Sequence, residues 1–425
     1  MKYKKYEFPS FNVYTIKTDK FKSCHLEIVY RDNFNKDEFL KRSLLGDILT
    51  ISSKKYPKPK DMVIKKEELY RTRFYGVTTR IGNSMFTNFI LNFINPNYAL
   101  EKDFFDEVIT FPFEMLENPN TKDDAFDSKV FNIIKNQYKD DIISIKENPN
   151  KVAINSSLTA MDKDSNSSFG LIKCESELED ITPENLYKSY QKMMKTSLCD
   201  IFIIGNLDMD KVVKLIDKKF HNRSIKSQDI ELFVDNKTRK KMLEVKEESK
   251  FVQSQLINIF NLDSLTVRER NIVFPLFNHI FGNGTLNSKL CRYLREENSL
   301  CYSVASMYLK YDKLLLVKSS LALENIDLAN KLIIKALKEM QSGKFTEDEL
   351  TDAKTSLIFG TKVALDNPVS LIDNYVFNIY DNITLLGDRQ KDIKSVTKDE
   401  ITALAKKIKI NTIYVLSEEE SSCRK

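Results

Sequence analysis

Hydrophobic residues recur along this chain with two different periods. In residues 24–30 apolar and polar side chains alternate, which predicts a half-buried strand. In residues 39–53 leucine and isoleucine lie on one face of a predicted helix, and Asp208 is predicted to cap another at 209–219. The same patterns predict further strands at 76–81, 85–94, 200–204, 253–260, 302–310 and 314–323. They predict further helices at 101–117, 123–142, 264–281, 287–297, 326–341 and 346–365.

The order of these elements repeats, and so do several of their residues. Glu114-Met115 and Glu339-Met340 lie 225 positions apart, and four residues after each pair keep that separation. The four are Thr121, Asp123, Asp127 and Lys129 in the first copy and Thr346, Asp348, Asp352 and Lys354 in the second. Thr182 and Thr397 belong to another matching stretch, 215 positions apart. The period is too long for a solenoid, so the repeat predicts two homologous halves.

The elements within each half predict the fold class. Strands and helices in this order predict an α+β fold in which each half is a mixed or antiparallel sheet covered by helices on one face. Most of segment 222–245 is rich in charged and small polar residues, and we expect it to be a linker. The expected domains are therefore residues 1–221 and residues 246–425. A chain of 425 residues fits two domains of about 200 residues each.

Composition argues against several classes of protein. The 66 basic and 61 acidic residues leave a net charge of +5, which is a weak basis for binding nucleic acid. No apolar run reaches the ~18–20 residues of a membrane span. The first residues lack the apolar segment of a secretory signal. The 6 cysteines follow no zinc or disulfide spacing, which favours reduced thiols. We expect a cytoplasmic protein.

The sharpest local signal lies in residues 281–304. Its matching residues are Gly282 and Gly284, then Ser288-Lys289-Leu290, then Leu294-Arg295-Glu296, then Leu300-Cys301-Tyr302-Ser303. This series resembles the insulinase/pitrilysin family of zinc peptidases, which includes the mitochondrial processing peptidase. Members carry a glycine-bearing turn, Ser-Arg-Leu-Phe and then Leu-Arg-Glu-x-x-Gly-Leu-Ala-Tyr-Ser in their second domain. The chain departs from this pattern at Asn298 and Ser299, where the family usually has glycine.

The resemblance implies roles for three of these residues. It implies that Tyr302 hydrogen-bonds the carbonyl of the scissile bond, that Arg295 holds the substrate backbone, and that Gly284 allows close approach of the peptide. A phenol and a guanidinium are suited to stabilising charge on a carbonyl oxygen. Taken alone, a helical arginine is usually a solvated surface group and a strand tyrosine is usually half-buried core. Gly282 has the simpler interpretation of a residue that ends a helix.

The first half lacks the zinc motif of active family members. These carry His-x-x-Glu-His on a helix, which supplies two zinc ligands and a catalytic base. Counting back from Tyr56-Pro57 places Ser43, Gly46 and Asp47 at these positions. The further glutamate ligand of the family has no counterpart in helix 123–142. The 3 histidines, at positions 25, 221 and 279, are scattered, so we expect no metal site in this chain.

A chain with the arginine and tyrosine but without the metal motif implies a particular role. The resemblance implies a non-catalytic or half-site subunit of a heterodimeric zinc endopeptidase, inactive alone, which binds peptide and offers Arg295 and Tyr302 to a partner chain. Zinc is then expected in that homologous partner. Two alternatives remain open. One is a structural scaffold subunit, like metal-free relatives in respiratory complexes, and the other is a stand-alone peptide-binding pseudo-peptidase.

Overall fold

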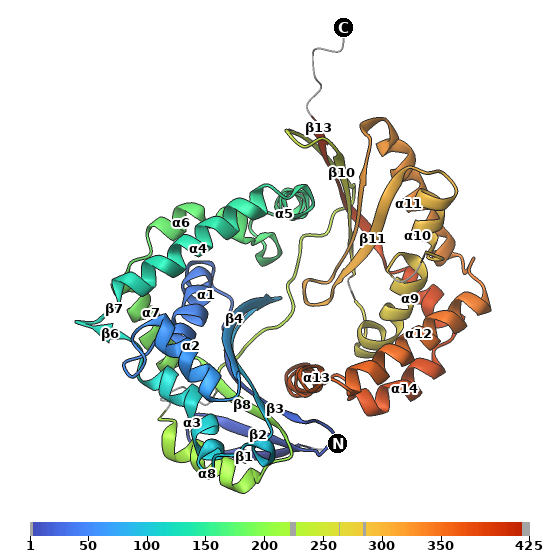
Figure 1. Cartoon of the computed structure of the whole chain (residues 1–425). Coiled ribbons are helices and arrows are strands. Elements are labelled where there is room, and N and C mark those ends of the chain that lie inside the picture. The colour runs from blue at the N-terminus through green and yellow to red at the C-terminus, as the bar shows by residue number, and fades with distance from the viewer. Residues whose placement is uncertain (1–2, 222–226, 263, 284–285, 419–425) are drawn as a thin grey trace. The chain divides into compact units, whose positions relative to one another are not determined.

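The computed structural model describes residues 3–221, 227–262, 264–283 and 286–418. They form two compact units (Figure 1). Unit 1 comprises Met1–Ile143, Lys173–Leu232 and Asp366–Val376, and unit 2 comprises Ser144–Ile172, Phe233–Leu365 and Phe377–Lys425. Each unit therefore includes a segment from the opposite half of the chain. The expected boundaries of the sequence halves, at 221 and 246, stay a prediction.

The sheet of unit 1 has six strands in the order β1-β2-β8-β3-β5-β4. Only β2 and β8 pair in parallel, and the other neighbours are antiparallel. The strands are β1 (Lys4–Glu7), β2 (Asn12–Lys17), β3 (Ser23–Asn33), β4 (Arg73–Ile81), β5 (Ser84–Ile94) and β8 (Leu198–Gly205). The free edges are thus β1, which is short, and β4, which has nine residues.

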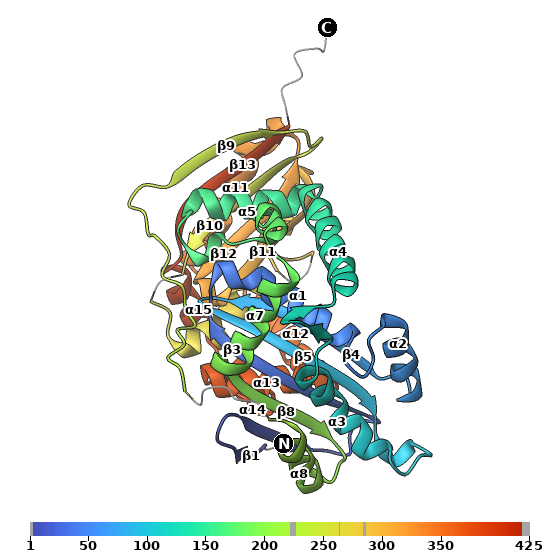
Figure 2. The same cartoon turned by 90° about the vertical axis from the view of Figure 1, so that its left-hand side faces the viewer.

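The sheet of unit 2 has five strands in the order β11-β12-β10-β13-β9. They are β9 (Leu243–Ser249), β10 (Ser254–Asn261), β11 (Cys301–Leu309), β12 (Leu314–Leu321) and β13 (Lys409–Glu418). Here β13 and β9, which run side by side in Figure 2, are the parallel pair. Apart from β1, which adds one antiparallel strand to the sheet of unit 1, both sheets have the same pairing: a parallel pair followed by three antiparallel contacts. This confirms the two homologous halves and the α+β class.

Helices cover each sheet. Those of the first half are α1 (Lys36–Ile51), α2 (Pro59–Glu68), α3 (Phe104–Glu117), α4 (Ser128–Lys146), α5 (Pro149–Met161), α6 (Glu175–Glu179), α7 (Pro183–Thr196) and α8 (Met209–Lys219). Those of the second half are the π-helical turn η4 (Glu269–Val273), α9 (Phe274–Phe281), α10 (Lys289–Cys291), the π-helical turn η5 (Arg292–Glu296), α11 (Ile326–Gln341), α12 (Glu347–Leu365), α13 (Pro368–Asp381), α14 (Leu386–Ser395) and α15 (Lys398–Ala405). No helix in the part of the chain that the structure describes is long and apolar enough to cross a membrane.

Side-chain caps explain part of the sequence repeat. Thr182 accepts a hydrogen bond from the backbone N–H of Asn185 at the start of α7, and Thr397 does the same for Glu400 at the start of α15. Such caps satisfy backbone donors that the first turn of a helix leaves free. Asp208 caps α8 as predicted, with its Oδ1 3.0 Å from the backbone nitrogen of Lys211.

The predicted start of the helix at 123–142 is wrong. Residues 121–126 form a small hairpin of β6 (Thr121–Lys122) and β7 (Ala125–Phe126), and α4 begins only at Ser128. Asp123 and Asp124, which join the two strands, have positive φ angles of 52° and 57°. Aspartate tolerates this left-handed region, and two such residues in sequence make a tight hairpin turn instead of a helical one.

The core of unit 2 extends to both faces of its sheet. One face packs against α9, α11 and α15. The other face packs against α5, through Ala153, Leu158 and Met161. Their contacts in the sheet are Ile257, Ile259, Leu314, Leu316, Tyr414 and Leu416. A helix from the first half of the sequence thus completes the core of the second unit.

Candidate functional site

Arg295 and Tyr302 lie next to each other in unit 2. The guanidinium carbon of Arg295 is 5.6 Å from the centre of the Tyr302 ring, within the range of a cation–π contact. Arg295 lies on η5, and its Nε is 3.2 Å from the Glu296 carboxylate. Its side chain is 40% exposed. The two side chains of the predicted pair therefore contact each other and are exposed, at the start of strand β11.

The local backbone displays Tyr302 to solvent. The pairing of β11 with β12 shifts register between Cys301 and Val304, so that Tyr302 lies in an irregular stretch of the edge strand. Such bulges redirect side chains. Tyr302 is 87% exposed, so it is not the half-buried core residue that a strand tyrosine usually is. Within the described residues its hydroxyl has no hydrogen-bond partner.

The turn between η5 and β11 keeps a conformation that glycine usually supplies. Ser299, at the position where the chain departs from the family pattern, has a φ of 51°. The backbone N–H of Ser299 donates to the carbonyl of Arg295 at 3.0 Å. The side chain of Asn298 donates to the carbonyl of Tyr293 at 2.7 Å. These hydrogen bonds close the turn without glycine and bring Tyr302 back beside Arg295.

A buried ion pair supports this segment from behind. The Lys289 ammonium lies 3.0 Å from the Glu339 carboxylate on α11, and its side chain is only 3% exposed. The Tyr293 hydroxyl donates to the same carboxylate at 2.6 Å. Burial opposes ionisation of Glu339, but the bonds from Tyr293 and Lys289 outweigh it and lower its pKa. We call these three residues the Lys289–Glu339–Tyr293 brace.

Of the two glycines of the motif, the structure describes only Gly282. Gly284 falls outside the described residues. Gly282 follows the last residue of α9, and its N–H donates to the carbonyl of Asn278 at 2.9 Å. A Cβ at Gly282 would overlap the side chain of Leu290. Its simpler interpretation, a residue that ends a helix under close packing, is therefore sufficient.

The position expected for the zinc motif holds a different arrangement. The Ser43 hydroxyl donates to the carbonyl of Phe39 in its own helix at 3.0 Å. Asp47 shares a hydrogen bond with Tyr138 of α4, and burial raises the pKa values of both groups. A serine, a glycine and one aspartate bonded to a phenol do not fit zinc, which needs three or four nitrogen, sulfur or carboxylate donors.

Close packing of two backbones reinforces this loss. A Cβ at Gly46 would lie 3.2 Å from the carbonyl carbon of Gly76 on β4. A Cβ at Gly76 would overlap the backbone of Gly46 itself. Helix α1 and strand β4 therefore meet at Gly46, the position that the sequence pattern aligns with the family's catalytic glutamate. Neither Gly76 nor Tyr138 was identified from the sequence, because no local pattern links them to α1.

The three histidines do not come together in a metal site. His25 is buried on β3, with Nδ1 2.5 Å from the Asn92 side chain and Nε2 3.6 Å from Glu27. His279 lies on α9, and burial lowers its pKa. His221 follows α8 at an exposed position. Among the residues with described positions, no group of three or more His, Cys, Asp or Glu side chains could hold a metal ion.

Comparisons with known proteins agree with this arrangement. Residues 180–357 match the family described as the peptidase M16 inactive domain. The probable inactive metalloprotease YmfF of Bacillus subtilis (strain 168) is 26% identical over 411 residues, which cover 96% of each chain.

Solved structures share the fold over nearly the whole chain. A conserved protein from Enterococcus faecalis V583 has a TM-score of 0.93 at 23% identity, covering 99% of this chain and 100% of that one. A peptidase M16 inactive domain from Pseudomonas fluorescens has a TM-score of 0.78 at 14% identity, covering 99% of each chain. The chain thus matches the insulinase-type (M16) peptidases over residues 180–357 and in its fold, and its sequence lacks the His-x-x-Glu-His motif.

Proposed function

We propose that this chain is a non-catalytic or half-site subunit of a heterodimeric zinc endopeptidase. It would bind the peptide substrate and present Arg295 and Tyr302 to a homologous partner chain that carries the zinc. The observation that supports this proposal most directly is the preserved contact between Arg295 and Tyr302, with both side chains exposed. A chain that served only as a scaffold would need neither group at the surface.

The chemistry of the pair follows from its donors. The Tyr302 hydroxyl is free to donate to a peptide carbonyl, where negative charge develops during hydrolysis. The Arg295 guanidinium has five N–H donors, and its Nε lies near Glu296. The remaining donors are available to the carbonyls of an extended backbone. The Lys289–Glu339–Tyr293 brace fixes the helical turn that carries Arg295, so that less conformational freedom is lost when a peptide binds.

A strand edge beside the pair suits an extended peptide. β11 is an edge strand of its sheet and begins at Cys301, one residue before Tyr302. Exposed edges bind extended peptides by backbone hydrogen bonds. The edge strand β4 of unit 1, with Tyr75 42% and Val77 38% exposed, offers a second edge of the same kind. We favour β11 because the two donors lie at its start.

Co-expression with a zinc-bearing homologue from the same genome tests the proposal. The mixture should elute as one complex in size-exclusion chromatography and cleave peptides faster than the zinc chain alone. In that complex, Arg295→Ala or Tyr302→Phe should lower kcat by about 10²-fold for each lost donor. Two exposed residues of unit 1 serve as matched controls, Arg71→Ala and Tyr98→Phe, and these should leave turnover unchanged.

Other outcomes would separate the alternatives. A complex that forms but cleaves no faster than the zinc chain would contradict the half-site role and favour a structural subunit. Peptide binding by the isolated chain without any partner would favour a stand-alone pseudo-peptidase, an alternative consistent with the inactive relative from Bacillus subtilis. Stoichiometric zinc and proteolysis in the pure chain would contradict all three.

A further inference from the structure

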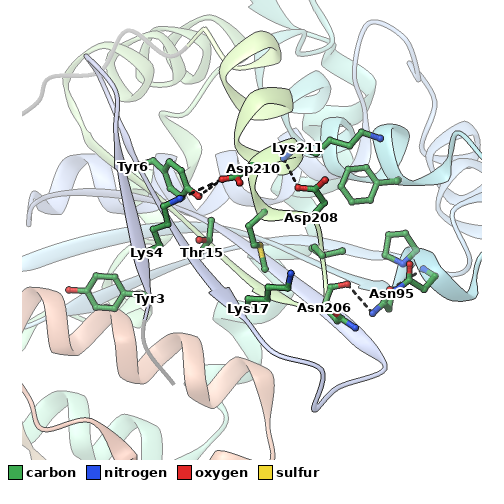
Figure 3. Close-up of a pocket in the computed structure, with 15 residues that line it drawn as sticks. Tyr3, Lys4, Tyr6, Thr15, Lys17, Asn95, Asn206, Asp208, Asp210 and Lys211 are labelled. Carbon is green, nitrogen blue, oxygen red and sulfur yellow. Dashed lines mark hydrogen bonds and ion pairs between the residues drawn. The ribbon is translucent and has the colours of Figure 1, made fainter.

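A pocket of about 800 Å³ lies in unit 1, at the end of β2 and β8 and beside the first turn of α8 (Figure 3). Strands β1 and β2, the segment after β5, the start of α3 and the turn before α8 line it. Its size falls in the range of small-molecule sites, about 300–1,000 Å³. Neither the residues aligned with the zinc motif nor Arg295 and Tyr302 line this pocket.

Most charges that line the pocket are already paired. Asp210 receives a hydrogen bond from the Tyr6 hydroxyl at 2.8 Å and an ion pair from Lys4 at 3.5 Å. Asp208 caps α8, and Lys211 forms an ion pair with Asp106. Of the three lysines that line the pocket, Lys4 and Lys211 thus have ion-pair partners and Lys17 has none among the described residues.

Two lining side chains on β2 remain without partners among the described residues. Lys17 has no ion pair or hydrogen bond from its ammonium group. The Thr15 residue is only 4% exposed, and its hydroxyl, which has no hydrogen-bond partner among the described residues, keeps contact with solvent. Two residues apart on a strand, these side chains point to the same side and their Cα atoms lie about 7 Å apart. In the view of Figure 3 the ammonium end of Lys17 lies between Thr15 and Asn206.

We propose that this pocket binds a small molecule that carries one carboxylate group. A single cation without an ion pair, Lys17, matches a single anion, and the Thr15 hydroxyl, which has no protein partner in the described part of the chain, can donate a hydrogen bond to the second carboxylate oxygen. A phosphate dianion fits less well, because the Asp208 carboxylate already occupies the first turn of α8 and repels further negative charge. Leu207, Met209 and Phe105 line the same space and suit a short apolar body on the ligand.

Titration of the full chain with N-acetyl-leucine tests this site, and the methyl group of Met209 reports on it. The protein is labelled at the methionine methyl carbon, and Met209→Leu assigns the signal among 11 methionines. We expect a saturable shift with a Kd of about 1 mM, as for a ligand of roughly a dozen non-hydrogen atoms. N-acetyl-leucinamide and inorganic phosphate should cause no comparable shift.

Variants separate the proposed contacts from general effects. Lys17→Gln should weaken binding by about tenfold, since it removes a charged hydrogen-bond donor, and Thr15→Val should weaken it several-fold. Lys5→Gln, on β1 but outside the pocket, should leave binding unchanged. Equal binding of the uncharged amide, tighter binding of phosphate, no effect of Lys17→Gln, or no Met209 shift at about 10 mM probe would each overturn the proposal.

Discussion

At the scale of single residues, Gly76 sets how closely α1 can approach β4. The two backbones meet at Gly46 and Gly76, and an added Cβ at Gly76 would overlap backbone rather than a movable side chain. Backbone atoms of a packed helix and strand cannot move aside cheaply. This pair of glycines therefore forms a close backbone contact at the position that the sequence pattern aligns with the family's catalytic glutamate.

Gly76→Ala should accordingly destabilise the protein by about 1–3 kcal/mol or more, because overpacking forces helix and strand apart. Urea denaturation of the full chain measures the change. Gly360→Ala is the matched control, since Gly360 lies in α12 with no atom within 4 Å of an added Cβ. That substitution should be neutral or stabilise the helix by about 0.5–1 kcal/mol. Equal effects of the two substitutions would contradict the importance of the contact.

At the scale of elements, the Lys289–Glu339–Tyr293 brace connects α11 to α10 and η5. Glu339 belongs to the sequence repeat, and its counterpart Glu114 instead accepts a hydrogen bond from Asn118 at 3.1 Å. Both copies of the repeat therefore have a glutamate at the same position of the helix, but its hydrogen-bond partners differ between the two halves. The second half uses the carboxylate to fix the turn that presents Arg295.

The brace should make this turn sensitive to acid. The pKa of Glu339 in the folded state is lowered from an ordinary value of 4.5. A lowered folded pKa means that the stabilisation is complete above about 4.5 and is lost as the pH falls through the folded value. The protection factors of residues 289–296 against hydrogen exchange, which correct for the intrinsic effect of pH on amide exchange, should therefore fall with the pH in this range, relative to the rest of unit 2. Glu339→Gln should remove the pH dependence and Glu114→Gln should not. Protection factors of residues 289–296 that do not change with pH in the unmodified chain would contradict the assignment.

At the scale of the whole molecule, the two sequence halves each contribute a segment to the opposite unit. Residues 144–172 include α5, which covers one face of the sheet of unit 2, and residues 366–376 belong to unit 1. Burial of apolar surface is the dominant favourable term in folding. The stability of unit 2 therefore depends on a helix encoded far from its strands.

Met161→Ala should reveal this dependence. Met161 is fully buried in the cluster beneath the sheet of unit 2, and its truncation should cost about 2–5 kcal/mol. Hydrogen exchange should then rise in β10 and β13 more than in the strands of unit 1. Ile143→Ala, at a position 48% exposed on α4, should have little effect. A rise in hydrogen exchange that is confined to unit 1 would contradict the conclusion that α5 stabilises unit 2.

Several elements followed directly from the local pattern of residues. The helices at 209–219 and 326–341 begin and end where the pattern predicted, because each has a continuous apolar face. The pattern missed α13 and the strands β1 and β2. It also missed α5, whose buried residues include small side chains such as Ala153 and Ser157 among polar neighbours. Residues of this kind become core only through the surface they pack against.

The sequence by itself determined the duplication, the family resemblance and the absence of a His-x-x-Glu-His motif, because these depend on residue identity and spacing along the chain. It also placed Arg295 and Tyr302 seven positions apart. Only the tertiary structure decided that the two side chains meet at the surface, that Tyr138 binds Asp47, and that Gly46 packs on Gly76. Each of these contacts joins segments whose distance in space depends on the folded backbone, which no local pattern encodes.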